Sequence, residues 1–140
     1  MTEKRLYPSD DLSAAFAVRG RVFMDEQGFS YDIDEHDANA WHLILCDNNT
    51  PIAAGRIIAD SAGKCHMGRI CVLKKYRGGM GKVLMDALIA FAKDLHYGDE
   101  ISLGAQTRVV GFYEKCGFTV CGEEYDDEGV PHTPMILINK

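Results

Sequence analysis

The chain has 140 residues, of which 46% are hydrophobic, and carries a formal net charge of −6. This length suffices for one hydrophobic core, so residues 1–140 are predicted to form a single domain. The absence of any run of about 18 apolar residues argues against a membrane-spanning helix. The acidic balance argues against a nucleic-acid partner.

The five cysteines stand at positions 46, 65, 71, 116 and 121. Their number is odd and none has C-x-x-C spacing, so they are interpreted as reduced, mostly buried thiols rather than a disulfide framework. The first residues, Met1 to Arg5, lead into no apolar signal region. A cytoplasmic location is therefore expected.

The predicted elements, in chain order, give an α+β fold with a mixed, mostly antiparallel sheet flanked by helices. Ser9 is the expected cap of a first helix that stops near Gly28. Predicted strands cover residues 3–7, 41–47, 52–60, 65–73, 101–106, 118–125 and 133–139. Two further helices are predicted at residues 80–96 and 107–116.

The most informative stretch covers residues 70–85, an apolar strand followed by a basic glycine-rich turn and an amphipathic helix. Glycines allow close backbone approach, and the N–H groups and dipole of a helix start attract phosphate. A Walker loop is excluded because Gly81-Lys82 is followed by Val83, and a dinucleotide fingerprint because Leu84 replaces its third glycine. The plain alternative is a tight turn before a helix.

Charge is unevenly spread around this turn. Residues 62–85 contain no Asp or Glu but hold 6 of the 15 Lys and Arg residues. These are Lys64, Arg69, Lys74, Lys75, Arg77 and Lys82. A local positive patch on an acidic protein suits a multiply anionic small ligand, whereas the alternative is a solvated charged turn.

The turn resembles the acyl-CoA loop of the GNAT superfamily of N-acetyltransferases, whose pattern after a strand is Arg/Gln-x-x-Gly-x-Gly/Ala. Aligned on Gly79 and Gly81, the chain has Tyr76 in the Arg/Gln position and Arg77 directly after it. Residues 106–118 resemble the closing motif of the same family.

In that closing motif, an Asn-like residue stands seven positions before the Tyr of a Phe-Tyr-Glu-Lys-x-Gly-Phe sequence. Here Gln106 and Tyr113 have this spacing. A third segment, residues 18–27, reads Val-Arg-x-x-Val-Phe-x-x-Glu-Gln and resembles a bacterial GNAT subgroup that also carries a Pro-His dipeptide near its end. Pro131-His132 fits that dipeptide.

The resemblance implies a GNAT-like acyl-CoA N-acyltransferase fold and transfer of an acetyl group from acetyl-CoA to a primary amine by direct attack in a ternary complex. The implied donor-binding residues are Cys71, Val72, Leu73, Tyr76, Arg77, Gly78, Gly79, Met80, Gly81, Lys82 and Gln106. An N–H near Val72 would polarise the thioester carbonyl, and Tyr113 would protonate the leaving thiolate.

Each assignment has a structural alternative. Tyr113 could be a core aromatic, and Gln106 could cap the following helix. Cys71 lies in an apolar strand without a sequence feature that would activate a thiolate, so a small buried thiol is favoured over a covalent intermediate.

The acceptor side is predicted less specifically. Glu26 is the leading candidate for the base that deprotonates the amine, and Glu35, Asp37 and His42 are further candidates; base catalysis through ordered water is the alternative. Glu35, Asp37, His42 and His132 are the candidate substrate-binding residues. His42 could equally be a structural histidine.

No metal site is expected, because the acidic stretch from Asp32 lacks the glycine and the last ligand of a calcium loop. Expected partners are a small-molecule or protein amine and a second copy of the chain in a homodimer. Two alternative functions stay open: a CoA-binding regulatory module without catalysis, and an acyltransferase of the acyl-homoserine-lactone synthase type.

Overall fold

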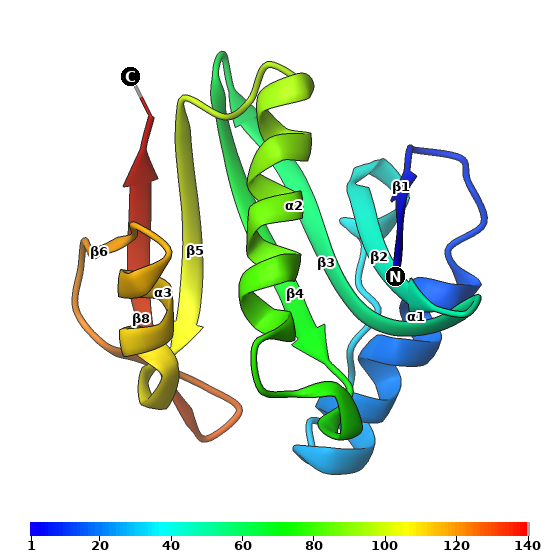
Figure 1. The fold of residues 1–140 in the computed structure, drawn as a ribbon. Helices are drawn as coiled ribbons and strands as arrows, with labels where there is room; N and C mark the ends of the chain where they lie inside the picture. The colour runs from blue at the N-terminus through cyan, green and yellow to red at the C-terminus, as the bar shows by residue number, and fades with distance from the viewer. Residues whose placement is uncertain (140) are drawn as a thin grey trace.

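The computed structural model describes residues 1–139 and contains one eight-stranded sheet (Figure 1). The strands are β1 Thr2–Leu6, β2 Trp41–Asp47, β3 Thr50–Ser61, β4 Lys64–Val72, β5 Glu100–Gln106, β6 Thr119–Val120, β7 Tyr125–Asp127 and β8 Val130–Ile138. Their order is β1-β2-β3-β4-β5-β8-β6, with β7 also paired to β8. Only β4 and β5 run parallel, so the predicted mixed, mostly antiparallel sheet is confirmed.

Helices flank the sheet on both faces. They are α1 Ser13–Arg19 with its π-helical continuation η1 Gly20–Glu26, α2 Met80–Asp94 and α3 Val110–Lys115, with short 3-10 turns η2 Asp37–Asn39, η3 Lys74–Tyr76 and η4 Thr107–Val109. On β3, Gly55 faces α2, since a Cβ there would touch Leu88. The next residue, Arg56, donates a hydrogen bond to Asp37, which also accepts one from Arg19 of α1. Because neighbouring strand residues point to opposite faces, α2 and α1 cover opposite faces.

Much of the core lies between α2 and the sheet, and α1 and η1 add Ala15, Val18 and Val22. Leu84, Leu88 and Phe91 recur at helical spacing on α2 and are fully buried against β-strand residues such as Ile57 and Met67. This packing fixes the start of α2 next to the end of β4, which is where the candidate site forms.

The start of the first helix differs from the prediction. Ser9 has φ +82° and does not cap a helix; α1 begins at Ser13, whose N–H donates to the Asp11 carboxylate at 2.9 Å. The predicted cap is wrong because Asp10 accepts a hydrogen bond from the Tyr7 N–H, which closes a turn before the helix. The predicted stop is confirmed: the helical segment ends at Glu26, and Gly28 has φ +78°.

The C-terminal strands also differ in detail. The predicted strand over residues 118–125 consists of two short pieces, β6 and β7, on either side of the position facing Pro134. Pro134 has no N–H to donate, and a Cβ on Gly122 would lie 2.8 Å from its ring. A continuous ladder therefore cannot form there.

None of the helices within residues 1–139 combines the length and apolar character needed to cross a bilayer.

Candidate active site

The sheet splits between β4 and β5. Parallel pairing joins Lys64–Met67 to Glu100–Leu103 and stops there, although β4 continues to Val72 and β5 to Gln106 (Figure 1). A bulge accompanies the split, because Ala54 faces Cys71 but Arg56 faces Gly68, and Arg69 adopts φ +51°. The two strand ends therefore present facing edges within residues 1–139.

A cavity of about 650 Å³ passes through this split. Its volume falls within the range of about 300–1,000 Å³ typical of small-molecule sites. Residues from the glycine turn, from β4, from β5 and from the β7–β8 hairpin line the same space. Segments distant in sequence thus converge on one site.

The glycine turn stands at one end of the cavity. Gly78 and Gly79 line it and have φ +109° and +119°, a region that favours glycine. Gly79 is followed by the first turn of α2, whose leading N–H groups have no partner within a helix. Gly81 lies close to α3, since a Cβ there would be 3.1 Å from the Phe112 ring. A helix start of this kind can bind an anion.

The Val72 N–H faces the split. The Leu73 N–H donates to the Ile52 carbonyl of β3 at 2.8 Å, and successive N–H groups of a strand point to opposite edges, so the Val72 N–H points toward β5. The Val72 carbonyl accepts a 3.0 Å hydrogen bond from Arg77 Nε on the same side. The end of β4 thus offers a donor to a ligand in the cavity.

Arg77 turns back from the glycine turn to Glu26. Its two terminal nitrogens donate to the Glu26 carboxylate at 2.6 and 2.8 Å, and these hydrogen bonds lower the pKa of Glu26. Arg77 lines the cavity but Glu26 does not. The predicted base is thus placed at the rim of the cavity as the partner of an arginine.

Tyr113 and Cys71 lie on the inner wall. Tyr113 of α3 is 8% exposed and packs edge-on to Phe112 and Phe118, with ring centroids 5.1 and 6.0 Å away. Burial raises the pKa of its phenol well above the ordinary value, so the hydroxyl stays protonated. Burial also raises the pKa of the Cys71 thiol to about 12, which disfavours a thiolate.

Comparison with known proteins identifies the family. Residues 12–138 match the model of the acetyltransferase (GNAT) domain. The chain belongs to this family. The uncharacterized N-acetyltransferase YjcF of Bacillus subtilis (strain 168) is 40% identical over 91% of this chain and 92% of its own length. An acyl-CoA N-acyltransferase from Pseudomonas aeruginosa superposes with a TM-score of 0.89 at 25% identity, covering 98% and 99% of the two chains.

The GNAT fold is also shared with more distant enzymes. The CoA-dependent acyl-homoserine lactone synthase BjaI superposes with a TM-score of 0.82 at 15% identity over 96% of this chain and 81% of BjaI. At this identity the similarity shows the fold alone.

Of the predicted donor-binding residues of this GNAT domain, seven line the cavity. These are Cys71, Val72, Arg77, Gly78, Gly79, Gly81 and Gln106. Among the described residues, Leu73 packs into the core, Tyr76 and Met80 pack against it, and Lys82 turns along α2 to Asp86 at 2.6 Å. These four residues do not line the cavity.

Gln106 bridges two parts of the molecule. Its Nε2 donates to Gln27 Oε1 at 2.9 Å, and its Oε1 accepts from Arg108 at 2.7 and 3.0 Å. It makes no capping hydrogen bond to the helical turn that follows, so the alternative of a helix cap is wrong. Its side chain is held at the split instead.

Asp37 and His42 do not line the cavity, but they belong to a buried network whose Asp32 and Arg56 do. Arg19 is fully buried and binds Asp37 and Asp32, while Arg56 binds Asp37 and Asp34. His42 is 1% exposed and contacts the Asp37 carbonyl at 3.1 Å. We therefore assign Asp37 and His42 to the scaffold that holds the segment after η1.

Of the remaining acceptor candidates, Glu35 has a side chain 83% exposed and lies outside the cavity, whereas His132 lines it. Tyr125 stacks on His132 with centroids 5.6 Å apart and an interplanar angle of 26°. Tyr125 and Tyr31 also line the cavity, and the sequence analysis did not single them out. Only their place in the fold marks them, because neither belongs to a motif.

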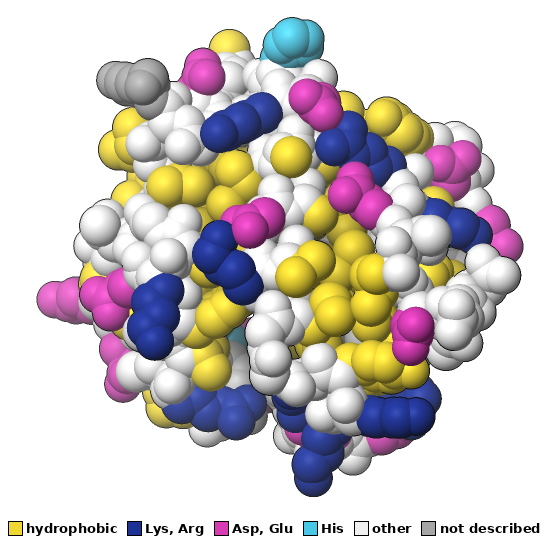
Figure 2. All heavy atoms as spheres, in the orientation of Figure 1, with side chains coloured by type: hydrophobic (Ala, Val, Ile, Leu, Met, Phe, Trp, Pro, Cys, Tyr) yellow, Lys and Arg dark blue, Asp and Glu magenta, His cyan; other side chains and the backbone are white. Residues whose placement is uncertain are grey.

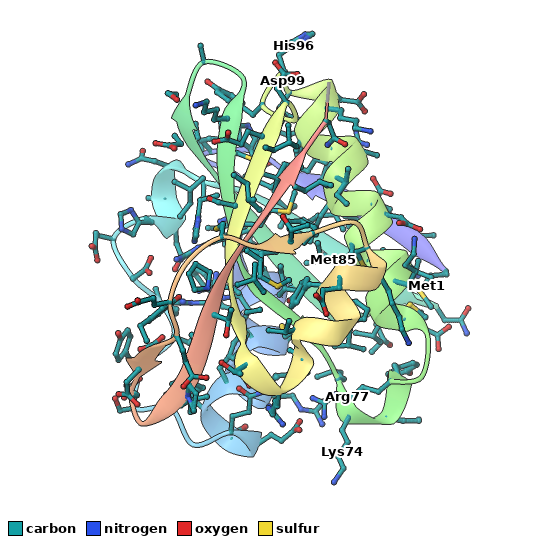
Figure 3. The ribbon with its side chains drawn as sticks, turned by 90° about the vertical axis from the view of Figure 1, so that its left-hand side faces the viewer. Met1, Lys74, Arg77, Met85, His96 and Asp99 are labelled. Carbon is teal, nitrogen blue, oxygen red and sulfur yellow. The ribbon has the colours of Figure 1, made fainter. Side chains whose placement is uncertain are left out.

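The basic run of residues 62–85 divides in space. Lys74 and Arg77 lie together beside the glycine turn, at the end of the molecule opposite His96 and Asp99 (Figure 3). Lys64 pairs with Glu100 at 3.6 Å within the paired part of β4 and β5, at its end far from the split, and Arg69 binds Asp32 and Asp34. Figure 2 shows several Lys and Arg side chains along the lower edge of the molecule, the end at which the turn between β4 and α2 lies in Figure 1.

No three His, Cys, Asp or Glu side chains of residues 1–139 converge in a way that could hold a metal ion.

Proposed function

We propose that this GNAT protein transfers an acetyl group from acetyl-CoA to a primary amine, by direct attack of the amine in a ternary complex. The observation that carries the proposal is the split between β4 and β5. One cavity at this split is lined by the glycine turn and by side chains of the β7–β8 hairpin. One end suits an anionic donor, and the other is open to an acceptor.

The residues present fit acetyl-CoA. Gly78 and Gly79 allow a pyrophosphate to approach the backbone, and the N–H groups from Gly78 to Lys82 would bind it at the start of α2. Extra positive charge comes from Lys74 and Lys75, which lie in the turn before it. The pantetheine arm would lie along residues 71–73 and hydrogen-bond the free strand edge.

Side chains and backbone at the centre supply the chemistry. The Val72 N–H is oriented to donate to the thioester carbonyl oxygen as negative charge develops there. The Tyr113 hydroxyl keeps its proton and can give it to the leaving thiolate. Gln106 would contact the arm from the β5 side.

The acceptor would enter beside the β7–β8 hairpin, where His132, Tyr125 and Tyr31 line the cavity. Its amine belongs to a small molecule or to a protein side chain. We further propose that residues 1–140 act as one cytoplasmic N-acetyltransferase domain in a homodimer, within the bacterial subgroup marked by residues 18–27 and Pro131-His132.

The test is release of free thiol from acetyl-CoA in the presence of a panel of primary amines, with mass spectrometry of the product. We expect a stoichiometric acetylamide and thiol release that depends on the amine. Acetyl-CoA binding without turnover across the panel would favour a regulatory module. Turnover only with S-adenosylmethionine as acceptor, from acyl-CoA or acyl-carrier protein, would favour an acyl-homoserine-lactone synthase.

A further inference from the structure

A protonated amine cannot attack a thioester, so an acetyltransferase site needs a group that takes a proton from the acceptor. Glu26, the base expected from the sequence, has both carboxylate oxygens bound by Arg77 and lies outside the cavity lining. A side chain that acts as the base should therefore be one that lines the cavity. This inference rests on the proposed function.

Three other basic groups in the cavity already have partners, and a fourth, the Asp127 carboxylate, belongs to a class of group that is intrinsically a weaker base than an imidazole. Asp32 is buried and bound by Arg19 and Arg69. Glu128 accepts hydrogen bonds from the N–H and the hydroxyl of Ser30. Nδ1 of His66 lies 2.8 Å from the Ser102 hydroxyl, at a level where β4 and β5 are still paired.

His132 is different. Its Nδ1 lies 2.9 Å from the Val130 carbonyl oxygen, which can only accept a hydrogen bond, so Nδ1 carries the proton. In the neutral imidazole the lone pair is then on Nε2. Within residues 1–139, Nε2 has no hydrogen-bond partner and is not among the fully buried polar atoms. The free nitrogen is thus the one able to accept a proton.

The surroundings hold the ring in place. His132 is 8% exposed and stacks on Tyr125. The Tyr125 hydroxyl lies against Gly104, since a Cβ added to Gly104 would be 2.1 Å from that hydroxyl. Because the ring is packed on one face and hydrogen-bonded at Nδ1, its orientation does not depend on a ligand.

Strand register places His132 at the level of the split. It lies opposite Gln106 in the β5–β8 ladder, three residues beyond Leu103, the last residue of β5 that pairs with β4. On β4 the position at the same level is Ile70, three residues beyond Met67. Ile70 lies next to the bulge and two residues before Val72. His132 lies across β5 from β4 and lines the cavity at the level where the two strands have separated.

We propose that His132 is the general base of the reaction and takes a proton from the acceptor amine at Nε2. The amine nitrogen forms the new bond to the carbonyl carbon, and the carbon–sulfur bond breaks. Before this attack His132 takes the first proton, that of the protonated amine, and releases it to solvent. The Tyr113 hydroxyl protonates the thiolate, and the second proton lost from the nitrogen restores the Tyr113 hydroxyl, so that the products are the acetylamide, free CoA and one proton.

The test uses His132→Asn, because an asparagine amide can replace the Nδ1–H donor to Val130 but has nothing in the place of Nε2. With the amine that the wild type acetylates best in the panel, we expect kcat at neutral pH to fall by about 100-fold. The dissociation constant for acetyl-CoA, measured by calorimetry, should stay unchanged. His36→Ala, an exposed histidine outside the cavity, is the matched control.

A base role predicts a specific pH dependence. As pH rises, more of the amine is deprotonated in solution, so the rate deficit of His132→Asn should shrink. Tyr125, Asp127, Glu128 and Arg108 line the cavity near His132 and are present in both proteins, so their titration cancels in the ratio.

A deficit that stays constant with pH, or no deficit at all, would overturn the assignment of His132 while leaving the proposed function intact. Absence of turnover by the wild type with every amine would instead overturn the proposed function, and this inference with it.

Discussion

The Tyr113 hydroxyl and the Cys71 thiol face the same part of the cavity and are both kept neutral by burial. Neutrality has opposite consequences for them. A protonated phenol can still donate its proton to a thiolate as charge develops, whereas a protonated thiol is a poor nucleophile. The geometry therefore favours Tyr113 as an acid and direct attack by the amine over an acyl-cysteine intermediate.

Replacement of Tyr113 by Phe removes the hydroxyl and keeps the edge-on ring packing with Phe112 and Phe118. We expect kcat to fall by about 100-fold with little change in acetyl-CoA binding. Steady-state kinetics and calorimetry measure the two effects separately. Unchanged kcat would remove Tyr113 from the chemistry.

Replacement of Cys71 by Ala should leave kcat essentially unchanged, because a thiol with a pKa of about 12 carries almost no thiolate at neutral pH. The loss of a buried sulfur should lower the free energy of unfolding by about 1 kcal/mol. Loss of activity in a folded variant, or trapping of an acetylated Cys71 in the wild type, would contradict direct attack.

At the scale of elements, the glycine turn depends on backbone shape. Gly79 has φ +119°, and Ala there would be strained by about 1–3 kcal/mol. We expect Gly79→Ala to weaken acetyl-CoA binding by about tenfold, equivalent to about 1.4 kcal/mol. Gly20→Ala is the control, because Gly20 has φ −61° and open space for a Cβ. Equal affinities of the two variants would show that the turn does not bind the donor.

The buried network around Arg19 holds the segment after η1 against the sheet. Hydrogen bonds from Arg19 and Arg56 and the Asp34 N–H outweigh desolvation and hold the pKa of Asp37 far below its ordinary value of 3.8. A depressed folded-state pKa stabilises the fold above the unfolded-state pKa, and this stabilisation is lost as pH falls below that value.

Asp37→Asn should therefore cost about 3 kcal/mol at neutral pH, because it takes one charged partner from each of two buried guanidinium groups, leaving Arg19 with Asp32 and Arg56 with Asp34. The free energy of unfolding of the wild type should drop more steeply below about pH 4 than that of the variant. Urea unfolding across pH 2.5–7 measures both, with the exposed Asp25→Asn as control. Parallel pH curves would show that Asp37 does not carry the acid sensitivity.

At the scale of the whole molecule, the sequence predicted what is encoded locally. Strand and helix ranges followed from periodicity, and the two glycine-containing motifs indicated a GNAT fold that the family match confirms. The cavity lining by Gln106 and Tyr113 also agrees with their motif positions.

What escaped prediction depends on contacts between distant segments. Arg77 binds Glu26 across 51 positions, and Arg56 binds Asp34 across 22. The bulge at Arg69 arises from a register shift that composition does not reveal. The capping role expected of Ser9 failed because a competing turn, closed by Asp10, uses the same residues.

The central claim, that the split sheet and the glycine turn bind acetyl-CoA, is tested most directly by calorimetric titration of the wild-type protein with acetyl-CoA, beside ATP and NAD at equal ionic strength. The structure predicts one site per chain with a dissociation constant on the order of micromolar for acetyl-CoA, and no comparable heat with ATP or NAD. Absence of acetyl-CoA binding would contradict the proposed donor site and would mean that this GNAT fold has another function.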